Sequence, residues 1–281
     1  SSSLVVVLKG LCTFLEIPTH LRAIMQNNVL RFTKMHGLGN DFAVFDAVNQ
    51  NIPVTKDFIK KIGNRHTGIG FDQCLLVEPS HDSQVDFYYR IFNADGSEVG
   101  QCGNGERCLA RFIQHQGLSQ KERLTVATKS TLMKLRLNAD ETVTVDMGKP
   151  QFSPSSIPLL SREEQNNYSI ELQNQQITFH ALSLGNPHAV IDVSDSSAAP
   201  VETIGSQLSH HSIFPEQANV GFMQRISDSH IKLRVFERGC GETKACGSGA
   251  VAAAAIGHRF YGMASEISLS LPGGDLLISW P

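Results

Sequence analysis

The sequence predicts an α+β protein built from two similar halves, in each of which mostly antiparallel strands surround one long helix. Strand-like stretches outnumber helix-like ones and follow one another at hairpin-scale spacing, which favours antiparallel pairing. In addition, residues 98–105 (EVGQCGNG) match residues 242–249 (ETKACGSG), 144 positions later. Each copy reads Glu-x-x-x-Cys-Gly-x-Gly and leads into an apolar segment typical of a helix.

The repeat extends upstream of these two motifs. Residues 90–92 (RIF) match 234–236 (RVF) at the same spacing of 144, and residues 38–40 (LGN) match 184–186 (LGN) at a spacing of 146. Chance rarely produces three blocks in the same order at nearly constant spacing. We therefore interpret the chain as a duplicated unit with one cysteine at the same place in each half.

Composition limits the class of protein. The chain has 281 residues, which favours two domains, and its apolar content of 41% and charged content of 18% are those of an ordinary globular protein. The net charge of −3 gives no electrostatic reason to expect binding to nucleic acid or to an anionic membrane. Six cysteines in a chain of this length indicate reduced thiols. The apolar run 4–8 is too short to span a membrane, so we expect a cytoplasmic protein.

The first half is expected to begin after an extension, residues 1–24, which we predict to be loosely helical. The first domain is then 25–149, with strands over 29–33, 42–46, 74–77, 85–92, 124–127, 131–137 and 142–147, and helices over 55–64 and 103–116. Thr55 is a favourable N-cap for the first helix, because its hydroxyl accepts from an unpaired backbone N–H. Gly117 is suited to the left-handed position that ends the second helix.

The second half repeats this order of elements. Residues 150–158 contain three prolines and three serines and predict a linker that marks the domain boundary. The second domain, 150–281, has strands near 168–172, 177–184, 189–193 and 231–236, a helix over 247–260 and a hairpin over 269–280. Gly262 lies just past the end of the helix, and the turn of the hairpin falls at 272–274.

A cysteine at a glycine-flanked helix start is suited to acid–base chemistry. The N–H groups of the first turn and the helix dipole favour an anion, so a thiolate there is expected to have a lowered pKa. Flanking glycines let a ligand approach the backbone, whose N–H groups can hold a carboxylate. Two such helix starts, carrying Cys102 and Cys246, would present thiols to opposite faces of one bound molecule.

Other interpretations of these residues are weaker. Cys12, Cys74, Cys108 and Cys240 are expected to be buried small apolar side chains. A zinc site is disfavoured because the C-x5-C pairs do not align with each other in the two copies, and the short spacing of structural zinc sites is absent. Neither glycine-rich turn carries the Gly-Lys-Ser/Thr of a P-loop. No metal and no cofactor are therefore expected.

The motifs resemble those of the diaminopimelate epimerases from about residue 29 to residue 280. The residues that carry the resemblance are 35–42 (MHGLGNDF), 92–98 (FNADGSE), 101–105 (QCGNG), 185–188 (GNPH) and 241–249 (GETKACGSG). The resemblance implies an isomerase that needs no pyridoxal phosphate and interconverts LL- and meso-diaminopimelate for lysine and peptidoglycan synthesis. It implies two pseudo-symmetric domains, each with a barrel-like sheet around a central helix, and a homodimer as one possible assembly.

The resemblance also implies roles for individual residues. Cys102 and Cys246 match the catalytic acid–base pair of the family. The residues that match its substrate-binding positions are Asn40, Gln73, Asn93, Gly103, Asn104, Asn186, Asn219, Glu237, Arg238, Gly247 and Ser248. Within this set, Gly103, Asn104, Gly247 and Ser248 match the backbone donors to the reacting carboxylate. His188 and Glu237 match groups beside the thiols that tune them.

One departure from the family pattern concerns the end of the sequence. Family members continue past residue 280 with a strand that returns to the first domain, and without it we expect an unpaired sheet edge there. Residues 4–8 are a candidate to fill that edge. Three alternative functions stay open: a proline-racemase-like or other amino-acid epimerase, a binding relative without cysteine chemistry, and a thiol redox protein.

Overall fold

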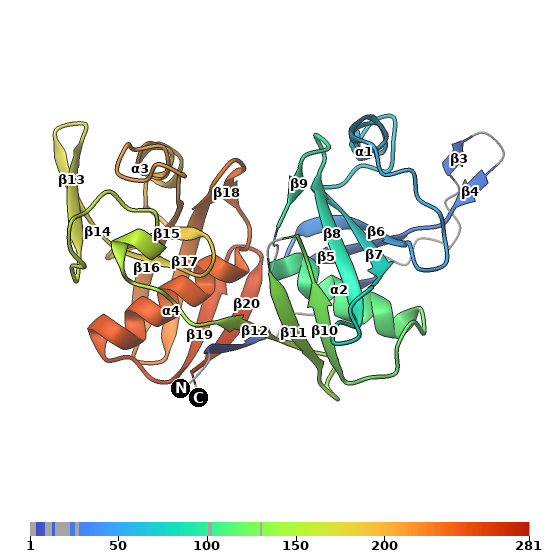
Figure 1. Ribbon diagram of the computed structural model, residues 1–281. Helices are drawn as coiled ribbons and strands as arrows, with labels where there is room; N and C mark the ends of the chain where they lie inside the picture. Colours follow the sequence, from blue (N-terminus) through green and yellow to red (C-terminus); the bar gives the residue numbers. More distant parts are fainter. Residues whose placement is uncertain are drawn as a thin grey trace. The chain divides into compact units, whose positions relative to one another are not determined.

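The computed structural model describes residues 4–8, 13–14, 23–25, 28–100, 103–129 and 131–280, with backbone alone before Leu30. The chain divides into two compact units. One comprises residues 10–145, and the other comprises residues 1–9 together with 146–281. Figure 1 labels the α-helices and most of the strands of both units.

Both units contain the same run of four strands. In residues 10–145 the run is β5 (Thr33–Gly37), β6 (Asn40–Asp46), β7 (Gln73–Pro79) and β8 (Phe87–Asn93). In the other unit it is β14 (Gln175–Ser183), β15 (Pro187–Asp192), β16 (Asn219–Ser227) and β17 (His230–Glu237). The outer pairs of each run are antiparallel and the middle pair is parallel. A parallel pair needs a crossover connection, and here α1 (Lys56–Gly63) provides it in the first run.

The rest of each unit also corresponds. Short strands β9 (Glu98–Val99) and β18 (Gly241–Thr243) pair with β8 and β17 and precede the long helices α2 (Gly103–His115) and α4 (Gly247–Tyr261). Each helix is followed by a hairpin: β10 (Arg123–Ala127) with β11 (Leu132–Leu137), and β19 (Glu266–Leu271) with β20 (Gly274–Ser279). The first strand of each hairpin runs parallel to β8 or β17. The remaining elements are β12 (Val143–Gly148), η1 (Pro154–Ser156), β13 (Tyr168–Leu172), η2 (Val201–Gly205) and α3 (Ser206–Ser209).

Each long helix packs inside the curve of its own sheet. Helix α4 contacts β14, β15, β16, β17, β19 and β20, and every residue from 249 to 257 is buried. A helix that is apolar all round requires such an environment, and its alanines let the strands approach closely. Helix α2 contacts β5, β6, β7 and β11. These arrangements confirm the predicted α+β class, with two pseudo-symmetric, mostly antiparallel units around central helices.

A matched pair of salt bridges supports the duplication. Arg90 on β8 forms two hydrogen bonds with Glu98, at 3.1 and 2.9 Å, and Arg234 on β17 forms the same two with Glu242, at 2.7 and 2.8 Å. Each glutamate begins the motif that leads to a cysteine. The same bidentate pair therefore links the first residue of the motif to the neighbouring strand, β8 or β17, in each half.

The predicted helix ends are also confirmed. Thr55 caps α1 by accepting from Phe58 N–H at 3.1 Å. Gly117 has φ +67°, and the N–H groups of Gly117 and Leu118 reach back to Gln114 and Ile113 after α2. Gly262 has φ +65° after α4. Gly117 and Gly262 thus end their helices in the left-handed conformation, which lets backbone N–H groups bond the last helical carbonyls.

The structure differs from the sequence-based expectations near the start of the chain. The described parts of 1–25 are strands and not helix: β1 (Leu4–Leu8), β2 (Thr13–Phe14) and β3 (Ala23–Met25). β1 pairs with β20, with Val5 opposite Ser279, so it extends the unit of the second half and not that of the first. The strand expected over 29–33 is instead β4 (Asn28–Leu30), which pairs with β3, followed by β5.

The stretch predicted as a linker is packed. Gln151 forms a β-bridge with Ser183, and Ile157 is fully buried in the apolar core formed by β13, β14, β16 and α3. The prolines of residues 150–158 are exposed or half-buried, and the buried Ile157 holds this segment against the core. Strand β16 and the η2–α3 segment were not predicted, because Gly221 interrupts the apolar alternation and residues 201–209 mix polar and apolar residues without a clear period.

Candidate active site

Cys246 occupies the N-cap position of α4. Its backbone is extended, with φ −127° and ψ 112°, and its thiol accepts from Gly249 N–H at 3.3 Å. The first intrahelical bond joins Ala250 N–H to the Cys246 carbonyl, so the Gly247 and Ser248 N–H groups precede the helical ladder. Such N–H groups at a helix start are suited to binding an anion. The predicted helix-start position of this cysteine is thus confirmed.

The expected low pKa of this thiol is wrong. Burial raises the pKa of Cys246 well above its usual value, and the nearby Glu237 carboxylate adds to the rise. The Ser248 hydroxyl and the Gly249 N–H act in the opposite direction but are outweighed. Desolvation disfavours a charged sulfur more than one helix turn favours it. Burial therefore favours the protonated thiol at Cys246.

Glu237 lies beside the thiol and is itself buried. Burial raises its pKa, and a hydrogen bond from Thr243 and an interaction with Cys246 partly oppose that rise. Glu237 ends β17 and Thr243 ends β18, so the hairpin holds both residues next to the start of α4. The thiol of Cys246 thus favours the charged Glu237 carboxylate, whereas that carboxylate disfavours a thiolate at Cys246.

A chain of hydrogen bonds connects three further predicted residues to Cys246. His188 Nε2 lies 3.0 Å from Asn186 Oδ1, and Asn186 Nδ2 donates to the Ser248 hydroxyl at 3.4 Å. The Ser248 hydroxyl is 3.6 Å from the Cys246 sulfur. Because the Asn186 oxygen accepts, His188 Nε2 carries the proton. Burial, followed by the positive charge of Arg238, lowers the pKa of His188 to about 3, so the ring is neutral.

Asn219 and Arg238 complete the second-half group. Asn219 starts β16 directly opposite His188 on β15, and its oxygen accepts from the Arg238 backbone N–H at 3.0 Å. The Asn219 Nδ2 donates to Pro187 O at 3.4 Å. The Arg238 guanidinium donates to Glu216 O at 2.8 Å. All the second-half residues predicted to form the site are therefore brought together within one unit.

The first half gathers its own predicted residues. Gln73 and Asn93 face each other across β7 and β8, and Gln73 Nε2 donates to Asn93 Oδ1 at 3.0 Å. Asn93 Nδ2 donates to the Ser97 hydroxyl at 3.1 Å. Asn40, at the start of β6, donates from Nδ2 to Asp72, the residue before Gln73, at 3.0 Å. These three amides thus surround one end of the β6–β7 parallel pair.

The start of α2 is described from Gly103 onward, and Cys102 lies outside the described residues. Asn104 is buried, and its oxygen accepts from Arg107 Nη2 at 2.5 Å. An added Cβ on Gly37 would lie 3.3 Å from Asn104 O, so that glycine lets β5 approach the first turn of the helix closely. Gly103 begins the helix, as the sequence predicted.

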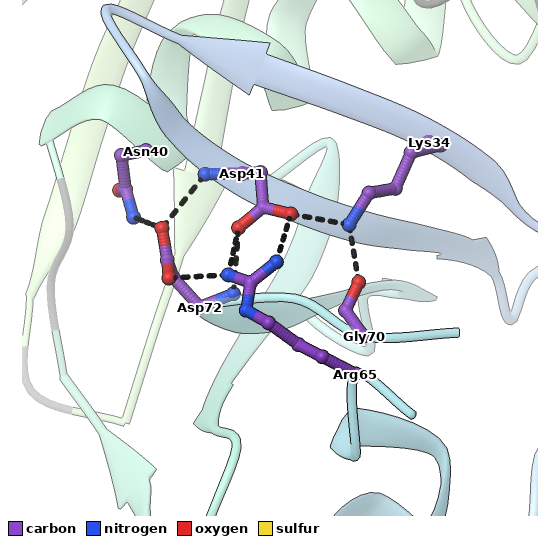
Figure 2. Close-up of polar contacts among 6 residues, drawn as sticks. All are labelled: Lys34, Asn40, Asp41, Arg65, Gly70 and Asp72. Carbon is purple, nitrogen blue, oxygen red and sulfur yellow. Dashed lines mark hydrogen bonds and ion pairs between the residues drawn. The ribbon is translucent and has the colours of Figure 1, made fainter. Parts of the chain in front are cut away.

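Sequence reasoning missed two features of the first half. Glu106 in α2 is fully buried, and burial raises its pKa to about 7 against the opposing charge of Arg107. The sequence did not indicate a buried acid at position 106, because this position lies within the apolar pattern of the helix and the matching residue in the second copy is Ala250. The second feature is a charged cluster at residues 34, 41, 65 and 72 beside Asn40 (Figure 2). No repeat in the second half indicates this cluster.

The other cysteines divide into two environments. Cys74 and Cys108 are fully buried, as expected, and burial raises the pKa of Cys74. Cys240 is exposed, so the expectation that it is buried is wrong; it follows Gly239, with φ +78°, in the turn between β17 and β18. Cys12 lies outside the described residues.

Two features are absent from the part of the chain that the structure describes. No helix there is long and apolar enough to cross a membrane. No group of three or more His, Cys, Asp or Glu side chains in the same residues is placed to hold a metal ion.

Solved structures share this fold. A hydroxyproline epimerase from Agrobacterium vitis, crystallised with trans-4-hydroxy-L-proline, matches with a TM-score of 0.65 and 14% identity, over 91% of this chain and 84% of that one. A probable proline racemase from Agrobacterium radiobacter K84 matches with a TM-score of 0.61 and 12% identity, over 88% and 87%. The fold is thus that of a class of proteins that includes this hydroxyproline epimerase and this probable proline racemase.

Sequence comparison identifies the family within this class. The diaminopimelate epimerase family model matches residues 32–153 and 180–281. The diaminopimelate epimerase of Legionella pneumophila strain Philadelphia 1 is 59% identical over 253 residues, which cover 90% of this chain and 91% of that protein. The chain belongs to the diaminopimelate epimerase family, and it is an isomerase.

Proposed function

We propose that this chain interconverts LL- and meso-diaminopimelate without a cofactor or metal, and that Cys102 and Cys246 exchange protons with the reacting carbon. The observation that carries the proposal is Cys246 at the N-cap of α4, with Glu237, Ser248 and Asn186 beside it. The 59% identity to a diaminopimelate epimerase supports the substrate. The proposal includes the lysine and peptidoglycan pathways, a cytoplasmic location and a homodimer, as the family resemblance implies.

The proposed proton transfer uses one thiolate and one protonated thiol. In the direction in which Cys246 acts as the acid, a thiolate at Cys102 takes the proton from the carbon, and the C–H electron pair becomes a carbanion conjugated with the carboxylate. The Cys246 S–H then gives its proton to the opposite face, leaving a thiolate. The raised pKa of Cys246 keeps this thiol protonated, so a proton is present to be donated. In the reverse direction the two thiols exchange roles.

The helix start stabilises the charge that develops on the carboxylate. We infer that the Gly247 and Ser248 N–H groups, with those of Gly103 and Asn104, donate to its oxygens. Donors already fixed in place stabilise a developing anion without reorganisation. His188 stays neutral and holds Asn186 through its proton, so it orients the amide and adds no charge beside the thiol.

The test is turnover of LL-diaminopimelate by purified protein after dialysis against a chelator, with pyridoxal phosphate absent. We expect conversion to a mixture with the meso form, measured by chiral chromatography. Proline and hydroxyproline serve as comparison substrates, because the fold is shared with enzymes named for them. Activity that depends on metal or pyridoxal phosphate, or that is confined to proline, would overturn the proposal.

A further inference from the structure

Thr243 is placed by the β17–β18 pair within reach of the Glu237 carboxylate. Val235 lies directly opposite Thr243, and Glu237 lies opposite Gly241. Alternate residues of a strand share one face, and diagonal neighbours across an antiparallel pair are close enough for their side chains to meet. Thr243 and Glu237 are diagonal neighbours of this kind. Accordingly, the Thr243 hydroxyl donates a hydrogen bond to Glu237 Oε1.

The same face of the hairpin packs against the start of α4. An added Cβ on Gly249 would lie 3.1 Å from Val235 Cγ2, so Val235 contacts the first turn of the helix closely. Glu237, two residues further along β17, has a side-chain interaction with the Cys246 thiol. The Glu237 carboxylate therefore interacts both with the thiol and with the hydroxyl of Thr243.

The bond uses the one hydrogen that Thr243 can donate. A threonine hydroxyl has a single O–H, and an ionised carboxylate is an acceptor only. A hydrogen bond to an ionised acceptor is roughly twice as strong as one between neutral groups. Burial raises the pKa of Glu237, and the hydroxyl of Thr243 acts in the opposite direction. The hydroxyl thus favours the ionised carboxylate and restricts its rotation.

The first half of the chain lacks both members of this pair. The β8–β9 and β17–β18 pairs have the same register. At the spacing of 144, Asn93 matches Glu237 and Val99 matches Thr243. Asn93 donates instead to the Ser97 hydroxyl, at 3.1 Å. The threonine therefore occurs in the half that has a carboxylate for it to hold, and an apolar side chain takes its place in the other half.

We propose that Thr243 is a positioning residue for the reaction, which holds the Glu237 carboxylate in the orientation in which it contacts the Cys246 thiol. This inference rests on the proposed function, because that function gives Cys246 its role. Thr243 acts only through Glu237. Without the hydroxyl the carboxylate rotates more freely, and the sulfur loses a fixed neighbour. The loss is therefore expected in the chemical step and not in substrate binding.

The first test is the pair Thr243→Val and Thr243→Ser. Valine keeps the shape of the side chain without the hydroxyl, and Val99 occupies the matching place in β9. Thr243→Val should lower kcat for LL-diaminopimelate at least tenfold and change KM by less than about twofold, since a loss in kcat alone reports on the chemical step. Thr243→Ser should keep kcat within about threefold of native. A native kcat in Thr243→Val, or an equal loss in Thr243→Ser, would overturn the inference.

A double-mutant cycle tests whether Thr243 acts through Glu237. In a Glu237→Gln background, Thr243→Val should alter kcat by less than about twofold, because residues that act as one unit do not have additive effects. A loss as large as in the native background would show that Thr243 acts independently of Glu237, contrary to the proposal.

Thr142→Val is the matched control. The Thr142 hydroxyl also donates to a carboxylate, Asp140 Oδ1, at 2.6 Å, next to the start of β12 and outside the candidate site. The same substitution there should leave kcat and KM within about twofold of native, while its melting temperature reports the cost of losing a hydroxyl–carboxylate bond. A tenfold loss of kcat in Thr142→Val would contradict the inference, because the effect would not be specific to Glu237.

A substrate-free readout separates this inference from the proposed function. If the native protein does not epimerise diaminopimelate, the proposed function fails, and the contact is then decided by titration of Glu237. The titration is followed by 13C NMR of the glutamate carboxyl carbons, with Glu237→Gln identifying the signal. Thr243→Val should raise the pKa of Glu237, because the hydroxyl that lowers it is gone, and Thr142→Val should not. Both variants keep Cys246, the titratable group of α4 that interacts with Glu237. An unchanged pKa of Glu237 in Thr243→Val would refute the inference without reference to any substrate.

Discussion

Replacing Cys246 with alanine is expected to lower the rate of epimerisation at least a thousandfold. The substitution removes the thiol at the N-cap of α4, and the Ser248 hydroxyl nearby is too weak an acid to take over proton donation at neutral pH. Cys102→Ala should have an effect of the same order, since each thiol serves one face of the carbon. Steady-state assays in both directions measure the loss.

The control for this substitution is Cys108→Ala. Cys108 is fully buried in α2 and has no role in the proposed reaction, so its loss should cost about 1 kcal/mol of stability and leave kcat nearly unchanged. Near-native turnover in Cys246→Ala would show that Cys246 is not one of the two bases.

Gly249→Ala is expected to lower kcat roughly tenfold while leaving the thiol in the chain. An added Cβ at this position would lie 3.3 Å from both the Cβ and the Sγ of Cys246, and 3.1 Å from Val235 Cγ2. Val235 is buried, so we expect the contacts to be relieved by shifts of a few tenths of an ångström that include the cysteine. A misplacement of about 1 Å at a reacting group can cost roughly a hundredfold in rate, and this smaller shift is expected to cost roughly tenfold.

Gly221→Ala is the matched control for this effect. Its added Cβ would meet the Leu233 Cδ1 methyl at 3.3 Å, a comparable contact with a side-chain tip in the same unit. It should change kcat by less than about twofold. If Gly249→Ala retained native kcat, the glycine of the motif would serve the fold and not the placement of the thiol.

The sequence predicted the repeated order of elements because local signals were strong. Thr55, Gly117 and Gly262 mark helix ends by their own backbone and side-chain chemistry, and the paired motifs mark the two long helices. The described strands between residues 4 and 25 were not predictable in this way, because β1 is stabilised by pairing with β20, about 270 residues away. Strands that depend on distant partners carry little local signal.

The candidate site was likewise predictable where motifs mark its residues and not predictable where it depends on distant contacts. The resemblance named residues that the structure gathers within each half, such as Asn186, His188 and Asn219. It did not predict the protonation state of Cys246, because desolvation depends on burial by β17 and β18 and not on the motif itself. The roles of Asp72 and Arg65 were not predicted, because their contacts with Asn40 and Asp41 join positions up to 32 residues apart and leave no local pattern in the sequence.

The central claim is that two thiols act on opposite faces of one carbon, and hydrogen exchange in D2O tests it most directly. At early times, LL-diaminopimelate is converted in D2O, and deuterium at the reacting carbon is measured by mass spectrometry in both substrate and product. The account predicts deuterium in the product and almost none in the remaining substrate, because the base that removes the proton is not the acid that returns one. Deuterium entering both at equal rates would contradict it, because a single base would then serve both faces.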